Sequence, residues 1–167
     1  MQHASPSVVL LAALLLIPCV HSLAQEEELT MSLLLTADRP VLTGAPPGAL
    51  VVGAEPAATV VLPAEPSQEL LFAALQLQTY VRKISGAVLP VALVEEEVAG
   101  NRVLLGSAAG VDVPEGLAAE GYLLRSLGPD LAVVGGSDLG TVYGAAEVLV
   151  LFRRVAKPFI SSSALVP

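Results

Sequence analysis

The sequence predicts an α/β (α+β) domain in which two helices pack on a mixed β-sheet of four or more strands. Short runs rich in Val, Leu and Thr, bounded by Gly and Pro, are interspersed with two segments of helical periodicity. The predicted order is β-β-α-β-β-β-β-α, with no internal repeat. Such an order favours a mixed sheet covered by helices on one face over a strictly alternating doubly wound fold.

Residues 1–24 are typical of a secretory signal peptide. The apolar run 8–17 is too short for a helix that spans a bilayer, which needs about 20 residues. Ser22 and Ala24 place small residues at the −3 and −1 positions of a cleavage site before Gln25. We therefore expect a secreted or periplasmic protein that leaves the membrane after cleavage, with an uncleaved anchor as the alternative.

Residues 25–48 are expected to be a loosely ordered N-terminal segment. The segment begins with the acidic run 26–28 and ends in the Gly/Pro-rich loop 44–48. Two short β-branched runs follow, at residues 49–53 and 59–62, and each is bounded by Gly or Pro. We expect both runs to be strands.

Residues 67–85 carry the clearest helical pattern. Ser67 is placed as the N-cap, and Glu69 lies in the first turn, where a negative charge favours the helix dipole. Gly86 is placed for a C-terminal cap. Apolar residues spaced by three or four form one stripe, and two basic residues lie in the last turn (Leu70, Ala74, Leu77, Val81 and Ile84; Arg82 and Lys83).

The remaining elements are four strands and a second helix. Strands are expected at residues 90–94 and 102–105, separated by the acidic loop 95–97. Residues 122–126 and 131–134 predict a hairpin that turns at 128–130. The second helix begins near Ser137 or Asp138, with apolar residues at helical spacing (Val142, Ala145, Ala146, Leu149 and Phe152).

Composition excludes several classes of chemistry from the mature chain. The two histidines and the one cysteine, His3, His21 and Cys19, all lie within the expected signal peptide. Without them the chain has no catalytic triad, no catalytic thiol, no histidine-ligated zinc and no disulfide. The formal net charge of −8 disfavours nucleic acid as a partner. We expect no cofactor-binding residue and no metal ligand.

The glycine-rich segment 133–140 (VVGGSDLG) invites comparison with dinucleotide-binding turns, because it follows a strand and opens a helix. Gly135 and Gly136 are adjacent, however, so the spacing does not match G-x-G-x-x-G. We therefore expect these glycines to form a tight strand-to-helix turn with close packing. A nucleotide-binding enzyme is the more distant alternative.

Acidic and aromatic residues offer no clear catalytic or sugar-binding site. Glycoside hydrolysis needs two carboxylates across a cleft, but the spacing of the acids in the sequence identifies no such pair. Glu147 on the second helix is the single acid that is hardest to exclude as a catalytic residue. Tyr80 and Tyr143 are expected to pack with their hydroxyls at the surface. We therefore predict no catalytic residue among the candidate acids (Asp38, Glu55, Glu65, Glu69, Glu95, Glu96, Glu97, Asp112, Glu115, Glu120, Asp130, Asp138 and Glu147).

Residues 75–91 (LQLQTYVRKISGAVLPV) lead from the first helix into a strand, and GYLLRS, LAVVGG and GTVYGAAEVL follow at 121–126, 131–136 and 140–149. The first segment resembles the signature E-L-Q-x-Y-hydrophobic-x-K-I-S/T-G-A-x-L-P, and the others resemble G-Y-x-I-R, L-x-I-x-G and G-T-x-Y-G-x-x-E-x-L. These motifs belong to the small domain that precedes the catalytic barrel in α-glucuronidases (glycoside hydrolase family 67), which is similar to the N-terminal domain of β-hexosaminidases. The resemblance covers residues 59–149.

The resemblance implies a non-catalytic domain over residues 49–152 whose partner is a (β/α)8 barrel. The family's catalytic carboxylates lie in that barrel of about 250 residues, so none is carried over to this sequence. Residues 153–167 depart from the family pattern and are expected to be an atypical tail, with the chain truncated before the barrel.

We therefore expect an accessory domain of a secreted glycoside hydrolase that serves polysaccharide or xylan breakdown and is inactive by itself. The alternative is a free-standing secreted interaction or scaffold domain without enzymatic activity. The C-terminal segment is apolar almost all round its helix, which predicts self-association through that segment (Val148, Leu149, Val150, Leu151, Phe152, Val155, Phe159 and Ile160).

Overall fold

The computed structural model describes residues 40–156. The expected signal peptide, the first part of the segment 25–48 and residues 157–167 lie outside the described residues, as do His3, Cys19 and His21. Within residues 40–156, no helix is both long enough and apolar enough to cross a bilayer.

The main sheet has five strands in the order β4-β3-β5-β7-β6. β3 pairs in parallel with both β4 and β5, and β7 pairs in parallel with β5, whereas the edge strand β6 is antiparallel to β7. The predicted mixed sheet and the predicted hairpin are therefore confirmed. The strands are β3 (Ala58–Leu62), β4 (Val91–Leu93), β5 (Asn101–Leu105), β6 (Tyr122–Leu127) and β7 (Asp130–Gly135).

Residues 49–53 differ from the single strand that the sequence predicts. Only β1 (Val51–Val52) is extended, and it forms a separate two-stranded antiparallel sheet with β2 (Glu55–Pro56). The chain turns between them at Gly53, whose φ is +64°. β2 was not predicted because Glu and Pro are both depleted in strands.

A buried asparagine holds the chain before β1 against the main sheet. The Nδ2 atom of Asn101, at the start of β5, donates to the carbonyl oxygens of Pro46 (2.8 Å) and Ala49 (3.0 Å). Asn101 is only 5% exposed, so its amide would be costly to bury without these bonds. The backbone amide of Gly48 also donates to the carbonyl oxygen of Pro129 (2.9 Å).

Helix α3 (Gln68–Ser85) has the boundaries and the caps that the sequence predicts. The Oγ atom of Ser67 accepts a hydrogen bond from the amide of Leu70 (3.3 Å), and Gly86 takes the left-handed conformation of a C-terminal cap. Four residues of the predicted stripe are buried, while Ile84 is half-buried. The stripe therefore faces the sheet as expected.

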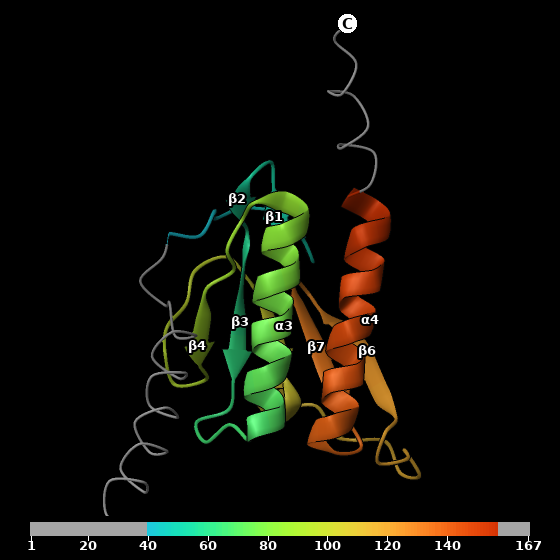
Figure 1. Cartoon of the computed structure of the whole chain (residues 1–167). Coiled ribbons are helices and arrows are strands. Elements are labelled where there is room, and N and C mark those ends of the chain that lie inside the picture. The colour runs from blue at the N-terminus through green and yellow to red at the C-terminus, as the bar shows by residue number, and fades with distance from the viewer. Residues whose placement is uncertain (1–39, 157–167) are drawn as a thin grey trace, which may run out of the picture. The chain divides into compact units, whose positions relative to one another are not determined.

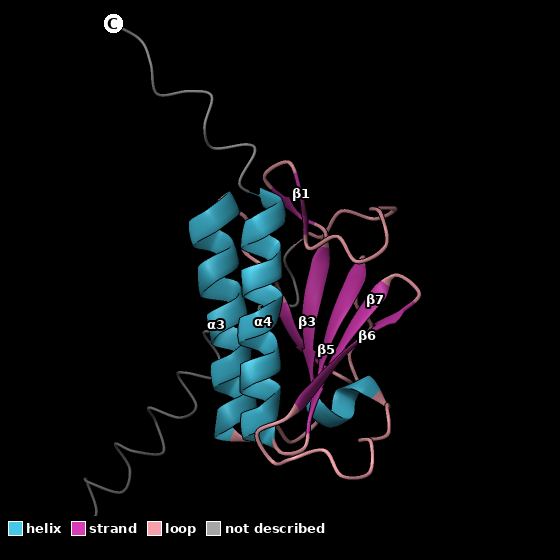
Figure 2. Cartoon of the chain, turned by 90° about the vertical axis from the view of Figure 1, so that its right-hand side faces the viewer, coloured by secondary structure: helices cyan, strands magenta, loops and turns pink. Residues whose placement is uncertain are grey.

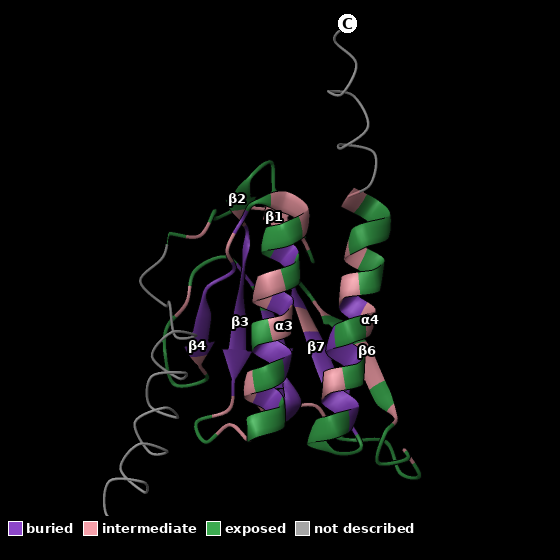
Figure 3. Ribbon diagram, viewed as in Figure 1, coloured by how far each residue is buried: buried purple, intermediate pink, exposed green. Residues whose placement is uncertain are grey.

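Both helices cover the same face of the sheet and run side by side (Figure 2). α4 (Asp138–Ala156) follows β7, and α3 follows β3. Since β3 and β7 run in the same direction, the two returning helices are parallel to each other. The main core lies between this helical layer and the sheet, where the purple buried residues gather in Figure 3.

Alternate residues of the central strands face away from the helices. Val61, Leu104, Ala132 and Val134 form a second apolar cluster on that face. The short 3₁₀ helix η1 (Gly106–Ala109), which the sequence did not predict, contributes Ala109 to this cluster.

Two glycines, Gly136 and Gly140, allow the loop 117–121 to lie directly against the start of α4, and a third, Gly135, packs against the first turn of α4. A Cβ atom on Gly136 would lie 2.2 Å from the carbonyl oxygen of Ala118, and one on Gly140 would lie 2.4 Å from that of Gly121. A Cβ on Gly135 would lie 2.2 Å from the amide nitrogen of Thr141. These distances leave no room for a side chain, so the predicted role of the glycines in close packing is confirmed.

The glycine contacts can be tested by comparing two positions in α4. Gly140→Ala should lower the free energy of unfolding by about 2 kcal/mol, because backbone overpacking outweighs the gain of about 1 kcal/mol in helix propensity. At Gly144 the added Cβ would first meet the Val133 side chain, 2.8 Å away, which can turn aside more easily than a backbone carbonyl. Urea unfolding followed by circular dichroism should show a smaller loss for Gly144→Ala. Equal stability of Gly140→Ala and the unmodified protein would contradict this account.

Candidate functional site

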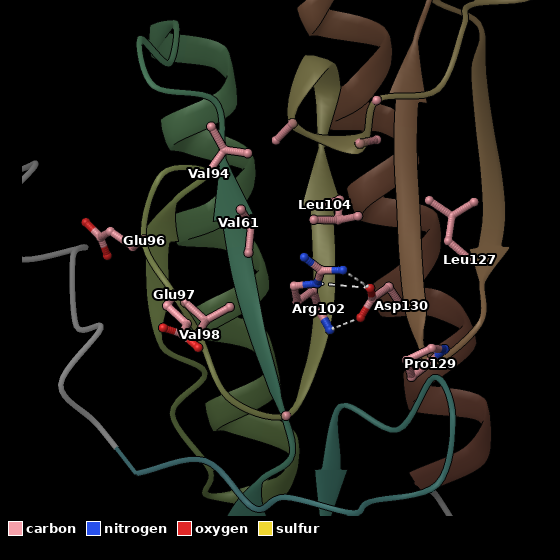
Figure 4. Close-up of a pocket in the computed structure, with 14 residues that line it drawn as sticks. Val61, Val94, Glu96, Glu97, Val98, Arg102, Leu104, Leu127, Pro129 and Asp130 are labelled. Atoms are coloured by element: carbon pink, nitrogen blue, oxygen red, sulfur yellow. Dashed lines mark hydrogen bonds and ion pairs between the residues drawn. The ribbon is translucent and has the colours of Figure 1, made fainter.

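A groove of about 580 Å³ lies on the face of the sheet opposite the helices, between the segment 94–100 and the β6–β7 turn (Figure 4). We call it the sheet groove. Its floor is aliphatic, with Val61 and Leu104 from the central strands and Val94, Val98 and Leu127 at its sides. Its charged groups are Glu96, Glu97, Arg102 and Asp130.

Arg102 and Asp130 form the only ion pair found within residues 40–156. One Asp130 oxygen, Oδ2, accepts from Nε (2.9 Å) and Nη2 (2.5 Å) of Arg102. The other oxygen, Oδ1, accepts from the backbone amide of Arg102 (2.8 Å). Asp130 is nearly buried, with 6% of its side chain exposed, whereas 49% of the Arg102 side chain is exposed. The carboxylate is therefore fixed by three hydrogen bonds while part of the guanidinium faces the groove.

Hydrogen bonding to Asp130 raises the pKa of Arg102 above its ordinary value, and partial burial opposes this effect. Arg102 therefore stays protonated at any physiological pH. The pair is close to neutral as a unit, so the formal charge of the sheet groove comes from Glu96 and Glu97.

The chain places Asp130 by a tight hairpin. Leu127 pairs with Asp130 in the β6–β7 register, which leaves only Gly128 and Pro129 in the turn. Gly128 has a φ of +67°, which a residue with a Cβ rarely adopts. The paired strands β5 and β7 start at the same edge of the sheet, so Asp130 lies beside Arg102 there.

The sequence identified Asp130 as one acid among many and Arg102 only as the start of a strand. Nothing in their spacing of 28 residues indicates a contact. Asp130 ends a hairpin turn, and Arg102 lies at the start of a buried strand. These positions indicate a contact between the two residues only once β5 and β7 are known to be neighbours.

The sheet groove offers little for catalysis. Asp130 is already paired with Arg102, and the Glu96 side chain points away from this pair (Figure 4). The groove lining includes no aromatic residue on which a sugar ring could stack. Among residues 40–156, no three His, Cys, Asp or Glu side chains gather in a way that could hold a metal ion.

The other predicted candidates lie outside the groove. Glu147 is half-buried on α4, on the helical side of the sheet. Tyr80, Tyr122 and Tyr143 are all exposed, and the Lys83 ammonium lies 5.0 Å from the centre of the Tyr80 ring. The structure brings none of these residues together with the ion pair of the sheet groove.

The glycine-rich start of α4 is occupied by backbone carbonyl groups. The amide of Gly136 donates to the carbonyl oxygen of Gly121 (2.9 Å), and the Ser137 hydroxyl donates to that of Ala119 (2.7 Å). Carbonyl oxygens repel phosphate, so this helix start differs from a phosphate-binding turn, in which free amide groups face the ligand. The geometry therefore disfavours the nucleotide-binding alternative.

No protein-family model matches the chain, and no curated protein matches it. Among solved structures, the chain is similar to a GH138 enzyme targeting pectin rhamnogalacturonan II, with 16% sequence identity and a TM-score of 0.42. The similarity covers 58% of this chain and 13% of that one, so the matched part is a small fraction of the enzyme's length. Membership in the α-glucuronidase N-terminal family therefore stays a prediction from the sequence.

The two roles of Asp130 can be separated by substitution. Asp130→Ala should lower the free energy of unfolding by about 1.5–3 kcal/mol, since it removes hydrogen bonds to a charged group and leaves the backbone amide of Arg102 without its acceptor. Asp130→Asn should lose less, because its amide oxygen can still accept from that backbone amide. Chemical denaturation measures both, with Asp112→Ala in an exposed loop as the control expected within about 0.5 kcal/mol of the unmodified protein. Equal losses for the Ala and Asn variants would show that the backbone hydrogen bond contributes nothing.

Proposed function

We propose that this chain is a non-catalytic N-terminal accessory domain of a secreted glycoside hydrolase resembling the α-glucuronidases, and that it packs against the catalytic (β/α)8 barrel. The sequence motifs over residues 59–149 support this proposal, and so does the α+β fold. The main observation that supports packing against a barrel is an apolar stripe on the outer side of α4.

Helix α4 is apolar on two opposite sides. Its inner side contacts the sheet and α3 through buried small and apolar residues such as Ala145 and Val148. Its outer side carries four residues spaced by four, three and four positions, which places them in one line along the helix. These residues, which we call the outer stripe, are all exposed: Leu139, Tyr143, Ala146 and Val150.

A solvated helix normally presents polar residues on the side opposite its buried face. In α4 the large members of the outer stripe are 42% (Leu139), 44% (Tyr143) and 42% (Val150) exposed. α3 also exposes large apolar side chains on its outer side, namely Phe72 (50%), Leu75 (38%) and Tyr80 (45%), although the exposed Lys83 ends that surface. A contiguous apolar stripe on a single helix favours contact with another folded surface.

The proposed partner is a barrel rather than a carbohydrate. Polysaccharide-binding faces need planar aromatic platforms, and the outer stripe contains one tyrosine among aliphatic residues. Aliphatic side chains instead suit the helices that surround a (β/α)8 barrel. In this proposal the domain contributes stability and orientation to the enzyme, and its partner contributes the reacting groups.

The packing role predicts binding to a catalytic barrel supplied separately. An α-glucuronidase lacking its own N-terminal domain serves as the probe in isothermal titration calorimetry. Leu139→Glu and Tyr143→Glu should each weaken binding at least tenfold, because each places a charge in an apolar interface. Val113→Glu is the matched control, since Val113 is also exposed but lies outside the helical layer. No binding by the unmodified protein would favour the free-standing interaction domain instead.

The chain by itself should hydrolyse no glycoside. Aryl glycosides and glucuronoxylan oligosaccharides should react at the rate of the buffer, because Asp130, the carboxylate that shares the sheet groove with Glu96 and Glu97, is held by Arg102 and cannot act as a free acid or base. Release of the aryl group or of reducing ends measures the rate. Turnover that Glu147→Gln abolishes, and that Glu120→Gln leaves unchanged, would overturn the non-catalytic assignment.

A further inference from the structure

Positive charge collects at one end of the helical layer. Because α3 and α4 are parallel, their last turns lie at the same end of the molecule (Figure 1). That end carries four of the chain's eight basic residues, although the chain as a whole has a net charge of −8. We call it the basic end, and it comprises Arg82, Lys83, Arg153 and Arg154, all exposed.

Negative charge collects at the opposite end. The parallel strands β4 and β5 finish there, and each is followed by an acidic loop, because the C-terminal ends of parallel strands share one edge of a sheet. The first loop leaves this edge after β4 with the exposed run 95–97 and turns back along the sheet, so that Glu96 and Glu97 line the sheet groove (Figure 4). The second loop spans residues 110–121 after η1. The second loop is held against the start of α4 by the hydrogen bond from Ser137 to Ala119. We call these two loops the acidic end.

Helix dipoles explain only part of this separation. Basic residues in a last turn and acidic residues in a first turn, such as Glu69 and Asp138, each stabilise their own helix. The loop acids have no such role, since neither acidic loop is helical. Glu55 on the β1–β2 hairpin and Arg125 on β6 are exceptions to the separation, but neither lies within one of the two clusters.

The basic end also has an uncovered residue on the inner side of α4. Thr141, Val148 and Val155 are spaced by seven residues, so they lie on the same side of the helix. Thr141 and Val148 are buried at 1% and 4% exposure, whereas Val155 is 79% exposed. The inner side of α4 therefore continues past the core of the described residues, and its last turn presents an aliphatic side chain to solvent beside two arginines.

We propose that the basic end docks on the acidic end of a second copy of this chain, in a head-to-tail contact. Charge complementarity supports this occupant, since Arg153 and Arg154 would meet the carboxylates of residues 95–97. The acidic end also presents exposed aliphatic residues, Val94 and Val113, at 47% each, which can cover Val155. Both surfaces occur on one chain but at opposite ends, so one molecule cannot satisfy its own contact.

The contact is heterologous, because it joins two different surfaces. Repetition of such a contact gives a ring if the rotation closes and an open chain if it does not. Copies with a net charge of −8 repel each other at long range, but salt near 0.1 M screens charges beyond about 10 Å. The nearest groups therefore determine whether association occurs.

Sedimentation velocity over a series of protein and NaCl concentrations tests the proposal. The mass should rise with protein concentration at low salt and fall towards the monomer near 0.5 M NaCl. Arg153→Gln with Arg154→Gln should weaken association about tenfold. Arg125→Glu is the matched control, because both changes lower the net charge from −8 to −10, and it should shift the association constant less than twofold.

Substitutions at the acidic end make the test sharper. Changing Glu95, Glu96 and Glu97 to Gln moves the net charge from −8 to −5, which reduces general repulsion, yet it should weaken association. Val155→Ser should weaken it a few-fold. Arg153→Glu with Arg154→Glu should be monomeric by itself, as should the change of residues 95–97 to Lys, while an equimolar mixture of the two should associate.

Three outcomes would overturn the proposal. A protein that is monomeric at all concentrations has no such contact. Association that strengthens with salt depends on apolar contacts and does not use the charged ends. Such association is what the apolar C-terminal segment by itself predicts. A mixture of the two charge-reversed variants that stays monomeric shows that the ends do not meet, and an anionic surface would then be the better partner for the basic end.

Discussion

The close approach of residues 117–121 to Gly136 and Gly140, and of the first turn of α4 to Gly135, determines where α4 begins. Carbonyl oxygens of this loop occupy the positions where side chains would otherwise lie. The amide of Gly136 and the hydroxyl of Ser137 donate to the same loop. The rotation of α4 on the sheet follows from this start, because the contacts of Gly140 and Gly144 leave only one side of the helix able to approach β7. The outward direction of the outer stripe is a consequence.

The direction of the strands organises the rest of the molecule. Parallel pairing of β3, β5 and β7 makes both helices return in the same direction, so their caps and charges accumulate at common ends. The same pairing brings Asp130 beside Arg102 across 28 residues of sequence. The carboxylate thereby adds a hydrogen bond between β5 and β7 where the regular ladder has not yet started.

The proposed function depends on surfaces more than on reactive groups. The sheet groove has an aliphatic floor, an ion pair that neutralises Asp130, and no aromatic platform. The outer stripe of α4 and the exposed Val155 are instead apolar surfaces on a chain of low aromatic content. Both features are the basis of the proposed contacts with other folded surfaces.

The sequence alone determined the elements whose signals are local. Ser67, Gly86 and the apolar stripe between them define α3, and alternating apolar runs with a Gly-Pro-Asp turn define the β6–β7 hairpin, because capping and periodicity act over a few residues. It missed β2 and η1, because elements of two and four residues are too short to show a periodic pattern. Only the tertiary structure decided the pairing of Arg102 with Asp130, the line of exposed residues on α4 and the separation of charge. These features depend on strand order and helix direction, and no local pattern encodes which distant segments become neighbours.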